Sequence, residues 1–344
     1  MSQEAELFYT FFLTKLISLA TQKSAPAANL TFSGPASWIA ASAKNAGTVR
    51  MCFVVSIIGT VMSATNTPHT TLDSLVAHIN DGASIAISTT RHGVAIRATH
   101  ALIDRQVRDL HLIAVPTSGM QADLLIGAGC VKTMESAGVT MDEQGQAPRF
   151  LAAVKTGSIS LKDTTCPALI SAIQAGEKGI PFIPMRGLIG SDLLANRDDY
   201  QTINNPMSDD SDPIVLLPAI TPDFALFHAP MADRHANVWI GKARELMTMA
   251  HAAKNTLITV EEIVYFDLMQ NELYAPATIP AHYIRSCCVA ENGAWPLPLP
   301  ERYKADADEL ARYVSLARTE QGFDSYLQSQ RKYAEPSRTV AASQ

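Results

Sequence analysis

The chain has 344 residues, of which 47% are hydrophobic and 17% charged, and its formal net charge is −6. This composition indicates a globular protein with a substantial core and excludes a disordered or fibrous chain. The negative charge, with no run rich in Lys or Arg, argues against a general nucleic-acid binder, because phosphate backbones select basic surfaces.

The cysteines and the apolar runs indicate the compartment. The five cysteines are odd in number and lack a Cys-x-x-Cys spacing, which favours reduced thiols over a disulfide framework or a zinc site. The 12-residue apolar run over residues 51–62 is too short to span a bilayer and has no basic flank for a signal peptide. We therefore expect a cytoplasmic protein without a bound metal.

The first 66 residues differ in character from the rest. Residues 6–20 are densely apolar and of helix length, and a stretch rich in Ser, Ala, Asn and Pro follows them. We expect residues 1–66 to be an N-terminal extension, either an appended segment or the product of an upstream start, with Met62 as the alternative first residue. One domain is expected over residues 67–319, and the polar residues 320–344 are expected to form a fraying tail.

From residue 67 onward, helix and strand patterns alternate. Apolar periodicity and start and stop signals predict helices at 71–79, 95–107, 167–175 and 243–254. Strands are predicted at 83–88, 110–115, 224–228, 238–240 and 256–260, and the adjacent Cys287 and Cys288 are interpreted as strand residues. Four short apolar segments fit a strand or a short helix: 124–126, 152–156, 159–161 and 214–217. This alternation predicts an α/β fold with an open, mostly parallel sheet and helices on both faces.

Several motifs carry weak chemical signals. The sequence Gly127-Ala-Gly129 is half of a dinucleotide fingerprint without its third glycine or acidic residue, so a tight turn after a strand is favoured over NAD binding. The segment 233–237, with Asp, His and Asn near His228, fits a turn closed by its own side chains better than a metal site. Glu261 and Glu262 follow a predicted strand and fit either a cleft or a solvated strand end.

The run over residues 178–192 is the most informative stretch. Its two prolines and three glycines give it too little periodicity for a helix or a long strand, so we expect a shaped surface loop. Arg186 offers a planar, permanently charged fork to a carboxylate or phosphate. The alternative is a stiffened connector whose arginine makes a surface ion pair.

A second stretch, residues 161–167, crosses from a strand to a helix. Asp163, Thr164 and Thr165 are suited to capping the following helix, and Pro167 suits its first turn. This capping is a sufficient structural explanation. Because helix N-termini also receive anionic groups, the same feature is suited to an acyl or carboxylate pocket.

The order of these pieces carries a family resemblance over residues 67–315. Seven motifs follow one another along the chain. They are Glu135-Ser-Ala-Gly-Val, Gln146-Ala-Pro-Arg-Phe, Thr165-Cys-Pro, Gly179-Ile-Pro-Phe-Ile-Pro-Met-Arg-Gly-Leu-Ile-Gly-Ser-Asp, His228-Ala-Pro-Met-Ala-Asp-Arg-His-Ala-Asn-Val-Trp, Leu257-Ile-Thr-Val-Glu-Glu-Ile and Gly293-Ala-Trp-Pro. Together they resemble the alpha subunit of family I CoA-transferases, in the glutaconate CoA-transferase-like branch. The combined order is far more specific than any one motif.

The resemblance implies both a partner and a reaction. It implies a heterodimer with a beta subunit, often doubled, that moves CoA between carboxylic acids through an acyl-glutamyl anhydride and a glutamyl-CoA thioester. CoA and acyl-CoA are substrates, and no permanently bound cofactor is expected. The nucleophilic glutamate belongs to the beta subunit in a Ser-Glu-Asn-Gly context. Glu291 of this chain stands in Ala-Glu-Asn-Gly near the end of the domain, and we interpret it as a coincidental match.

The resemblance also assigns candidate site residues. Arg186 is expected to hold a substrate carboxylate, the backbone of Gly187, Gly190 and Ser191 to line the site, and Asp163, Thr165 and Cys166 to supply polar contacts. The CoA loop after the first strand is expected at Thr89, Thr90 and Arg91, where many alpha subunits carry a Gly-Gly-aromatic sequence that this chain lacks.

Two alternatives keep the fold and change the role. Related subunits act in hydrolysis of CoA thioesters with ring opening, for which the nucleophilic glutamate is not needed. The missing Gly-Gly-aromatic loop motivates the second alternative, a non-catalytic scaffold subunit that only completes its partner.

Overall fold

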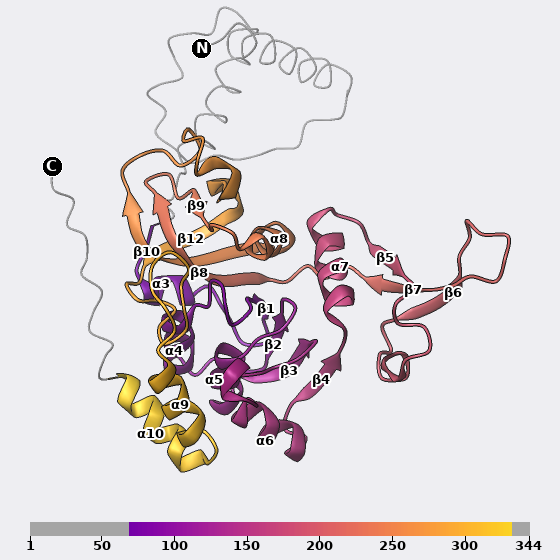
Figure 1. Cartoon of the computed structure of the whole chain (residues 1–344), viewed down its shortest axis with the longest axis horizontal. Coiled ribbons are helices and arrows are strands. Elements are labelled where there is room, and N and C mark those ends of the chain that lie inside the picture. Colours follow the sequence, from indigo (N-terminus) through magenta and orange to yellow (C-terminus); the bar gives the residue numbers. More distant parts are fainter. Residues whose placement is uncertain (1–68, 332–344) are drawn as a thin grey trace, which may run out of the picture. The chain divides into compact units, whose positions relative to one another are not determined.

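The computed structural model describes residues 69–331 (Figure 1). The predicted extension over residues 1–66 lies outside this part, as do residues 332–344. Within residues 69–331, no helix is long and apolar enough to cross a membrane.

The centre of the fold is a sheet of seven parallel strands in the order β12-β10-β8-β1-β2-β3-β4 (Figure 1). Two short antiparallel strands bring the sheet to nine: β9 pairs with the last residues of β8, and β11 pairs with β9. The predicted open, mostly parallel sheet is therefore confirmed. The strands are β1 (Ser84–Ile87), β2 (Leu110–Ala114), β3 (Val131–Ser136), β4 (Ser160–Asp163), β8 (Phe224–Asp233), β9 (Val238–Trp239), β10 (Asn255–Val264), β11 (Thr278–Ile279) and β12 (Ile284–Val289).

Helices cover both faces of this sheet because its central strands are apolar on both sides. In β1, Ile85 and Ile87 belong to one buried cluster and Ala86 to the other. The first cluster packs under α3, α4, α5, α6, α9 and α10, and the second under α7 and α8. The helices are α3 (Leu72–Val76), α4 (Ile96–Asp104), α5 (Met120–Gly127), α6 (Pro148–Thr156), α7 (Cys166–Glu177), α8 (Arg244–Ala252), α9 (Ala307–Leu316) and α10 (Glu320–Arg331).

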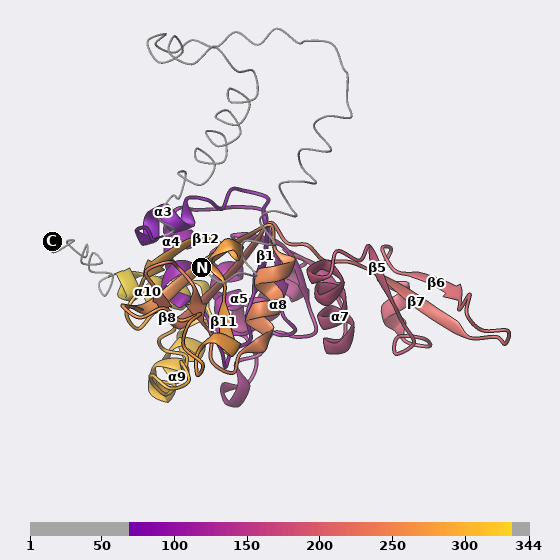
Figure 2. The same ribbon diagram turned by 90° about the horizontal axis from the view of Figure 1, so that it is seen from above.

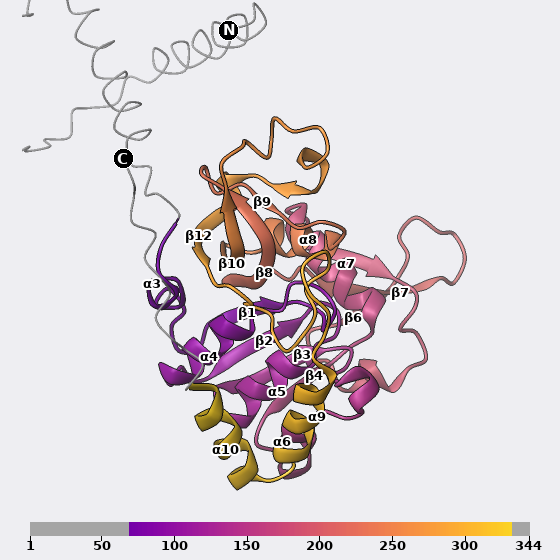
Figure 3. The same cartoon turned by 60° about the vertical axis from the view of Figure 1, so that its left-hand side comes forward.

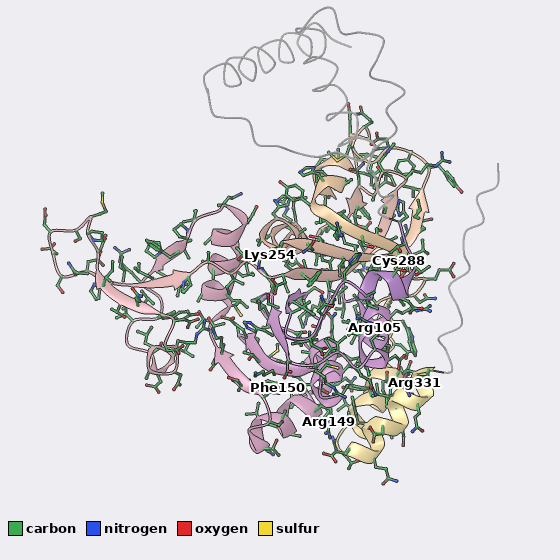
Figure 4. The ribbon with its side chains drawn as sticks, turned by 180° about the vertical axis from the view of Figure 1, so that it is seen from behind. Arg105, Arg149, Phe150, Lys254, Cys288 and Arg331 are labelled. Atoms are coloured by element: carbon green, nitrogen blue, oxygen red, sulfur yellow. The ribbon has the colours of Figure 1, made fainter. Side chains whose placement is uncertain are left out.

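The C-terminal end of the described chain differs from its prediction. A fraying polar tail was expected from Glu320, but residues 320–331 form α10, which lies beside α9 (Figure 3). Phe323 and Tyr326 are buried, and the ring of Tyr326 packs edge-on against Tyr313 of α9 with the ring centroids 4.8 Å apart. Arg331, labelled in Figure 4, lies at the end of α10 and pairs with Asp104 of α4. Two aromatic side chains three positions apart therefore bury this helix despite its polar composition.

The sequence left residues 124–126 open between a strand and a short helix, and it predicted no element at β3, at α9 or at β6 (Gln201–Asn204). The segment around residues 124–126 is α5, whose residues 120–126 are all buried, so it shows no polar face from which a helical period could be identified. The turn at Gly129, where φ is +68°, therefore follows a helix and not a strand. It leads into β3, whose sequence Val-Lys-Thr-Met-Glu-Ser is more than half polar.

A second, antiparallel sheet forms an arm that extends from the region of α7 (Figures 1 and 2). We call residues 178–221 the arm. It contains β5 (Phe182–Met185), β6 (Gln201–Asn204) and β7 (Pro213–Pro218) in the order β5-β7-β6. The chain leaves at Pro181 and returns at Ala219, whose N–H donates to the Pro181 carbonyl at 3.1 Å. A small core that includes Leu188, Val215 and Leu217 packs on α7.

A buried carboxylate joins three helices on one side of the parallel sheet. Asp123 of α5 accepts hydrogen bonds from the backbone N–H of Phe150 in α6 and from the hydroxyl of Tyr313 in α9, both at 2.7 Å. Figure 4 shows Phe150 and its neighbour Arg149 at the start of α6. Burial raises the pKa of Asp123 to about 6, because the hydrogen bonds only partly offset the loss of water.

This raised pKa predicts a pH-dependent contribution to stability. The folded protein holds the Asp123 proton more tightly than the unfolded chain does, so this residue's contribution falls as the pH rises from about 4 to about 6. In Asp123→Asn, the amide can still accept a hydrogen bond from Phe150 and donate one to Tyr313. We expect this variant to lose up to about 3 kcal/mol of the change in unfolding free energy between about pH 4 and about pH 6. Urea unfolding of both proteins at several pH values checks this, and parallel stability curves would contradict it.

Candidate active site

The strand order reverses direction between β1 and β8. From β1 the chain builds outward through β2, β3 and β4, and it then builds in the other direction through β8, β10 and β12. In such sheets, ligands bind outside the carboxyl ends of the strands, at and beside this reversal. The loops that follow the parallel strands therefore define the candidate site.

The predicted CoA loop follows β1 at the reversal. Thr90 is buried and donates a 2.6 Å hydrogen bond to Asp142, while Arg91 is exposed with its Nε 3.8 Å from the same carboxylate. Gly119, which precedes α5, packs so closely that a Cβ there would collide with the Thr90 methyl group and the Thr140 carbonyl. Asp142 and Gly119 thus hold Thr90 in place, while Arg91 of the same loop is exposed.

Beside this loop, a polar network lies where the strand order reverses between β1 and β8. His228 of β8 is fully buried, and its two ring nitrogens lie 2.8 Å from Thr259 Oγ1 and 2.8 Å from Glu261 Oε1. Glu261 also accepts from the hydroxyl of Tyr303 at 2.8 Å and from the N–H of Gly293 at 3.1 Å. Burial raises the pKa of Glu261, but the His228 and Tyr303 bonds outweigh it and leave that pKa below its ordinary value. This satisfied network ties β8, β10 and the segment after β12 together.

A small cavity of about 120 Å³ lies over the same reversal point. His92 and Gly93, directly after the CoA loop candidates, line it together with His228 and Lys242. The backbone N–H of His228 donates to the Gly93 carbonyl at 2.8 Å, which fixes the loop to β8. Glu262, the neighbour of Glu261, is exposed and pairs with Arg302, so of the two predicted glutamates only Glu261 joins the network.

The predicted acyl residues lie between the last residue of β4, Asp163, and the start of α7. Thr165 is the N-cap of α7 and accepts from the N–H of Ala168 at 3.3 Å, with a proline in the first turn, as the sequence indicated. Asp163 and Cys166 are exposed, Thr165 is half-buried and Thr164 is buried. We call residues 163–166 the acyl turn. It presents polar side chains at a helix N-terminus of the kind that favours anionic groups.

The loop that carries Arg186 packs on this helix. Leu188 is fully buried in one cluster with Ala168 of the first turn of α7. The hydroxyl of Ser191 donates to the Leu188 carbonyl at 2.8 Å, and Gly190 has φ +81°, a conformation that favours glycine. Gly187 and Gly190 are exposed. The arm therefore packs the predicted glycine loop, through Leu188, on the first turn of α7, which follows the acyl turn.

Arg186 is engaged by a neighbouring carboxylate. Its Nε and Nη2 donate to the two oxygens of Asp212 at 2.8 and 2.5 Å, and Asn205 donates to the same group at 2.7 Å. These bonds from Arg186 and Asn205 lower the pKa of Asp212 to about 2. The structure thus shows the surface ion pair that was the alternative for this arginine. Its side chain is 67% exposed, and its Nη1 makes no hydrogen bond with the described part of the chain.

The sheet order sets the separations along this edge. Three inter-strand spacings of about 4.8 Å put the end of β1, with Thr90, roughly 14 Å from the end of β4 and the acyl turn. Six spacings, about 29 Å, separate β4 from β12, which Glu291 follows. The structure therefore packs the loop after Arg186 on the first turn of α7 through Leu188, places the CoA loop candidates on the same edge of the sheet as α7, and leaves Glu291 at the far side of the sheet.

The segment after β8 is a self-satisfied turn, as the sequence indicated. Asp233 accepts from the backbone N–H groups of His235 and Asn237, both at 2.9 Å, and from the Asn237 side chain at 2.8 Å. Among residues 69–331, no cluster of His, Cys, Asp and Glu has the arrangement of a metal site.

A charged network beneath the acyl turn escaped the sequence analysis. Arg197 of the arm is almost fully buried, and its guanidinium donates to Glu135 of β3 at 2.8 Å and to Asp199 at 2.8 and 2.9 Å. His111 and Lys162 complete the network at 3.1 Å from Glu135 and Asp199 respectively. In the sequence, Glu135 stands out only as part of the motif Glu135-Ser-Ala-Gly-Val, and no spacing connects it to Arg197.

Comparison with known proteins identifies the family. A family model described as coenzyme A transferase matches residues 69–286. The chain is 29% identical over 271 residues to the A subunit of 3-oxoadipate CoA-transferase from Pseudomonas knackmussii, covering 75% of this chain and 92% of the relative. It is 25% identical to the A subunit of glutaconate CoA-transferase from Acidaminococcus fermentans, covering 74% of this chain and 84% of the relative. This chain belongs to the coenzyme A transferase family, and the resemblance to its alpha subunits is confirmed.

Other relatives carry different reaction names. The chain is 24% identical to the cholesterol ring-cleaving hydrolase IpdA subunit of Rhodococcus jostii, covering 74% of this chain and 89% of the relative. Among solved structures, glutaconate coenzyme A-transferase of Acidaminococcus fermentans matches with a TM-score of 0.70 at 23% identity, covering 76% of this chain and 88% of that one. The AibA/AibB decarboxylase C56S variant matches with a TM-score of 0.67 at 26% identity, covering 76% of this chain and 97% of that one. One fold therefore serves several reactions.

Proposed function

We propose that this chain is the alpha subunit of a heteromeric CoA-transferase that moves CoA between an acyl-CoA and a carboxylic acid. The supporting observation is that the loop after Arg186 packs through Leu188 on the first turn of α7, which follows the acyl turn, on the edge of the sheet that also carries the CoA loop candidates. An arginine and a helix N-terminus together suit a carboxylate substrate. Two relatives of this chain are the A subunits of named CoA-transferases.

The chemistry follows the family reaction, with the nucleophile on a beta subunit. In that partner, a glutamate carboxylate attacks the acyl-CoA carbonyl and releases CoA thiolate, leaving an acyl-glutamyl anhydride. The thiolate then attacks the glutamyl carbonyl, forms the glutamyl-CoA thioester and releases the first acid. The same two steps run in reverse with the second acid. This chain would bind and orient the acid, with Arg186 on its carboxylate and Thr165 and Cys166 beside it.

Two arguments support a nucleophile outside this chain. Glu291 follows β12, about six strand spacings from the acyl turn. Glu135, on the strand next to β4, is only 3% exposed and is held by Arg197 and His111. Neither group is free to attack a thioester bound at the acyl turn.

Co-expression with a beta-type subunit tests the proposal. The complex is purified through a tag on this chain and assayed for CoA exchange between acyl-CoA and dicarboxylic or 3-oxo acids. Trapping with hydroxylamine or borohydride then reports a glutamyl thioester. A co-purified partner that carries the trapped thioester is the expected result. A stable complex that releases free CoA into water without a trapped intermediate would instead favour the hydrolase named for the IpdA relatives.

A non-catalytic scaffold role is the remaining alternative. In that case a beta-type subunit purified without this chain would exchange CoA at the rate of the complex. We expect it to be inactive by itself, because Arg186 and the acyl turn come from this chain.

A further inference from the structure

Two hydrogen bonds connect the acyl turn to the arm. Arg197 Nη1 donates to the carbonyl of Asp163 at 3.2 Å, and the hydroxyl of Tyr200 lies 3.0 Å from Thr164 Oγ1. The guanidinium of Arg197 stacks over the Tyr200 ring, 4.1 Å from its centroid. Two consecutive residues of the turn are therefore bound by two residues of the arm that touch each other.

Thr164 serves as an anchor for the turn. It is 4% exposed, whereas its neighbours Asp163 and Cys166 are exposed. A buried threonine cannot touch substrate from this position, but its hydroxyl fixes the backbone that aims the side chains on either side. The Thr164 N–H is also bound, to the Asp163 carboxylate at 2.9 Å.

Arg197 is itself fixed from three directions. Its partners are Glu135 of β3, Asp199 of the arm and the carbonyl of Asp163, the last residue of β4. A buried guanidinium with this many partners has one orientation, because breaking any one bond leaves a buried charge less well paired. The ring of Tyr200 lies against this fixed group, so its hydroxyl is held toward Thr164.

From these contacts we infer that Arg197 and Tyr200 are positioning residues for the carboxylic acid substrate: they set the geometry of the acyl turn through Asp163 and Thr164. This inference rests on the proposed function for its kinetic consequence. Its geometric consequence, the orientation of the exposed Cys166, does not depend on which reaction the complex catalyses.

A double-mutant cycle tests the Tyr200–Thr164 bond in the complex with a beta-type subunit. Tyr200→Phe and Thr164→Val each remove the same hydrogen bond with little change in shape. We expect each to lower kcat/KM for the accepting acid by roughly tenfold, because a misaligned site loses rate. The double variant is expected to be no slower than either single variant. Tyr265→Phe, at a tyrosine 78% exposed, is the matched control and should leave the rate unchanged.

The reactivity of Cys166 gives a readout that does not require activity. Within residues 69–331 it is the exposed cysteine, since the others are buried, and Cys52→Ser removes the remaining thiol. In that background we expect Tyr200→Phe and Thr164→Val to change the iodoacetamide alkylation rate of Cys166 by about threefold or more, the scale of one lost hydrogen bond. Tyr265→Phe should not change it.

The outcomes separate this inference from the proposed function. Unchanged Cys166 reactivity in both single variants would overturn the inference whatever the activity, and so would additive losses of kcat/KM in the double variant. A wild-type complex that moves no CoA, combined with altered Cys166 reactivity in the variants, would support the positioning role and refute the transferase.

Discussion

Arg197→Met is expected to lower the free energy of unfolding by about 3–5 kcal/mol. The substitution keeps most of the apolar length of the side chain but removes the charge that pairs with Glu135, whose side chain is only 4% exposed. At present, burial raises the pKa of Glu135, but the bond from His111 and the charge of Arg197 outweigh it and hold that pKa below its usual value. Without Arg197, the carboxylate keeps only His111 and the more distant Lys162.

Urea unfolding of the purified protein at neutral pH measures this loss. Arg186→Met is the matched control, because it breaks an arginine–aspartate pair of similar geometry on an exposed side chain and should change stability little. Adding Glu135→Gln to Arg197→Met should recover part of the loss, since it removes the unpaired charge. Equal stability of wild type and Arg197→Met would show that the buried pair contributes nothing to the fold.

Arg186→Ala is expected to lower kcat/KM for the accepting acid by roughly 10- to 100-fold, the scale of a charge-assisted hydrogen bond to a carboxylate. Arg186→Lys should recover only part of this rate, because an ammonium group lacks the planar fork. Steady-state kinetics of the complex with a beta-type subunit measure both. Assembly, followed by size-exclusion chromatography, should be unchanged because the side chain is exposed.

Asp212→Asn is the control for the ion pair. Asp212 holds two of the Arg186 nitrogens and stays ionised because its pKa is about 2. Replacing it with a neutral amide leaves the arginine in place and frees its charge, so the variant should use the acid at least as well as wild type. If Arg186→Ala keeps wild-type kinetics, or if both variants lose the same activity, the arginine serves only the structure of the arm.

The parallel sheet could be predicted because its strands have a strong local pattern. Runs such as residues 110–115 and 256–260 are apolar on both faces and alternate with helices that have caps or turn signals. The predicted Thr165 cap and the turn around Asp233 were found as expected, because both depend on neighbours within a few residues. Local hydrogen bonds of this kind are specified by local sequence.

The parts that escaped prediction depend on distant contacts. In β3, Glu135 interrupts the apolar pattern because it pairs with Arg197, which arrives from a segment 62 residues later. Likewise, α10 is buried through Phe323 and Tyr326 against helices whose positions no short window reveals. The acyl turn and the Arg186 loop were predicted as separate pieces, and only the fold of the arm shows that Leu188 of the loop packs on the helix that follows the turn.

The way the arm joins the body has an evolutionary consequence. Its two ends meet at Pro181 and Ala219, and its strands pair only with one another, so no strand pairing of the nine-stranded sheet passes through it. Insertions in the turn between β6 and β7, away from Arg197 and Tyr200, can therefore reshape the surface of the arm while the nine-stranded sheet keeps its architecture. A fold divided in this way lets the arm diverge among descendants of one gene without rebuilding the parallel sheet.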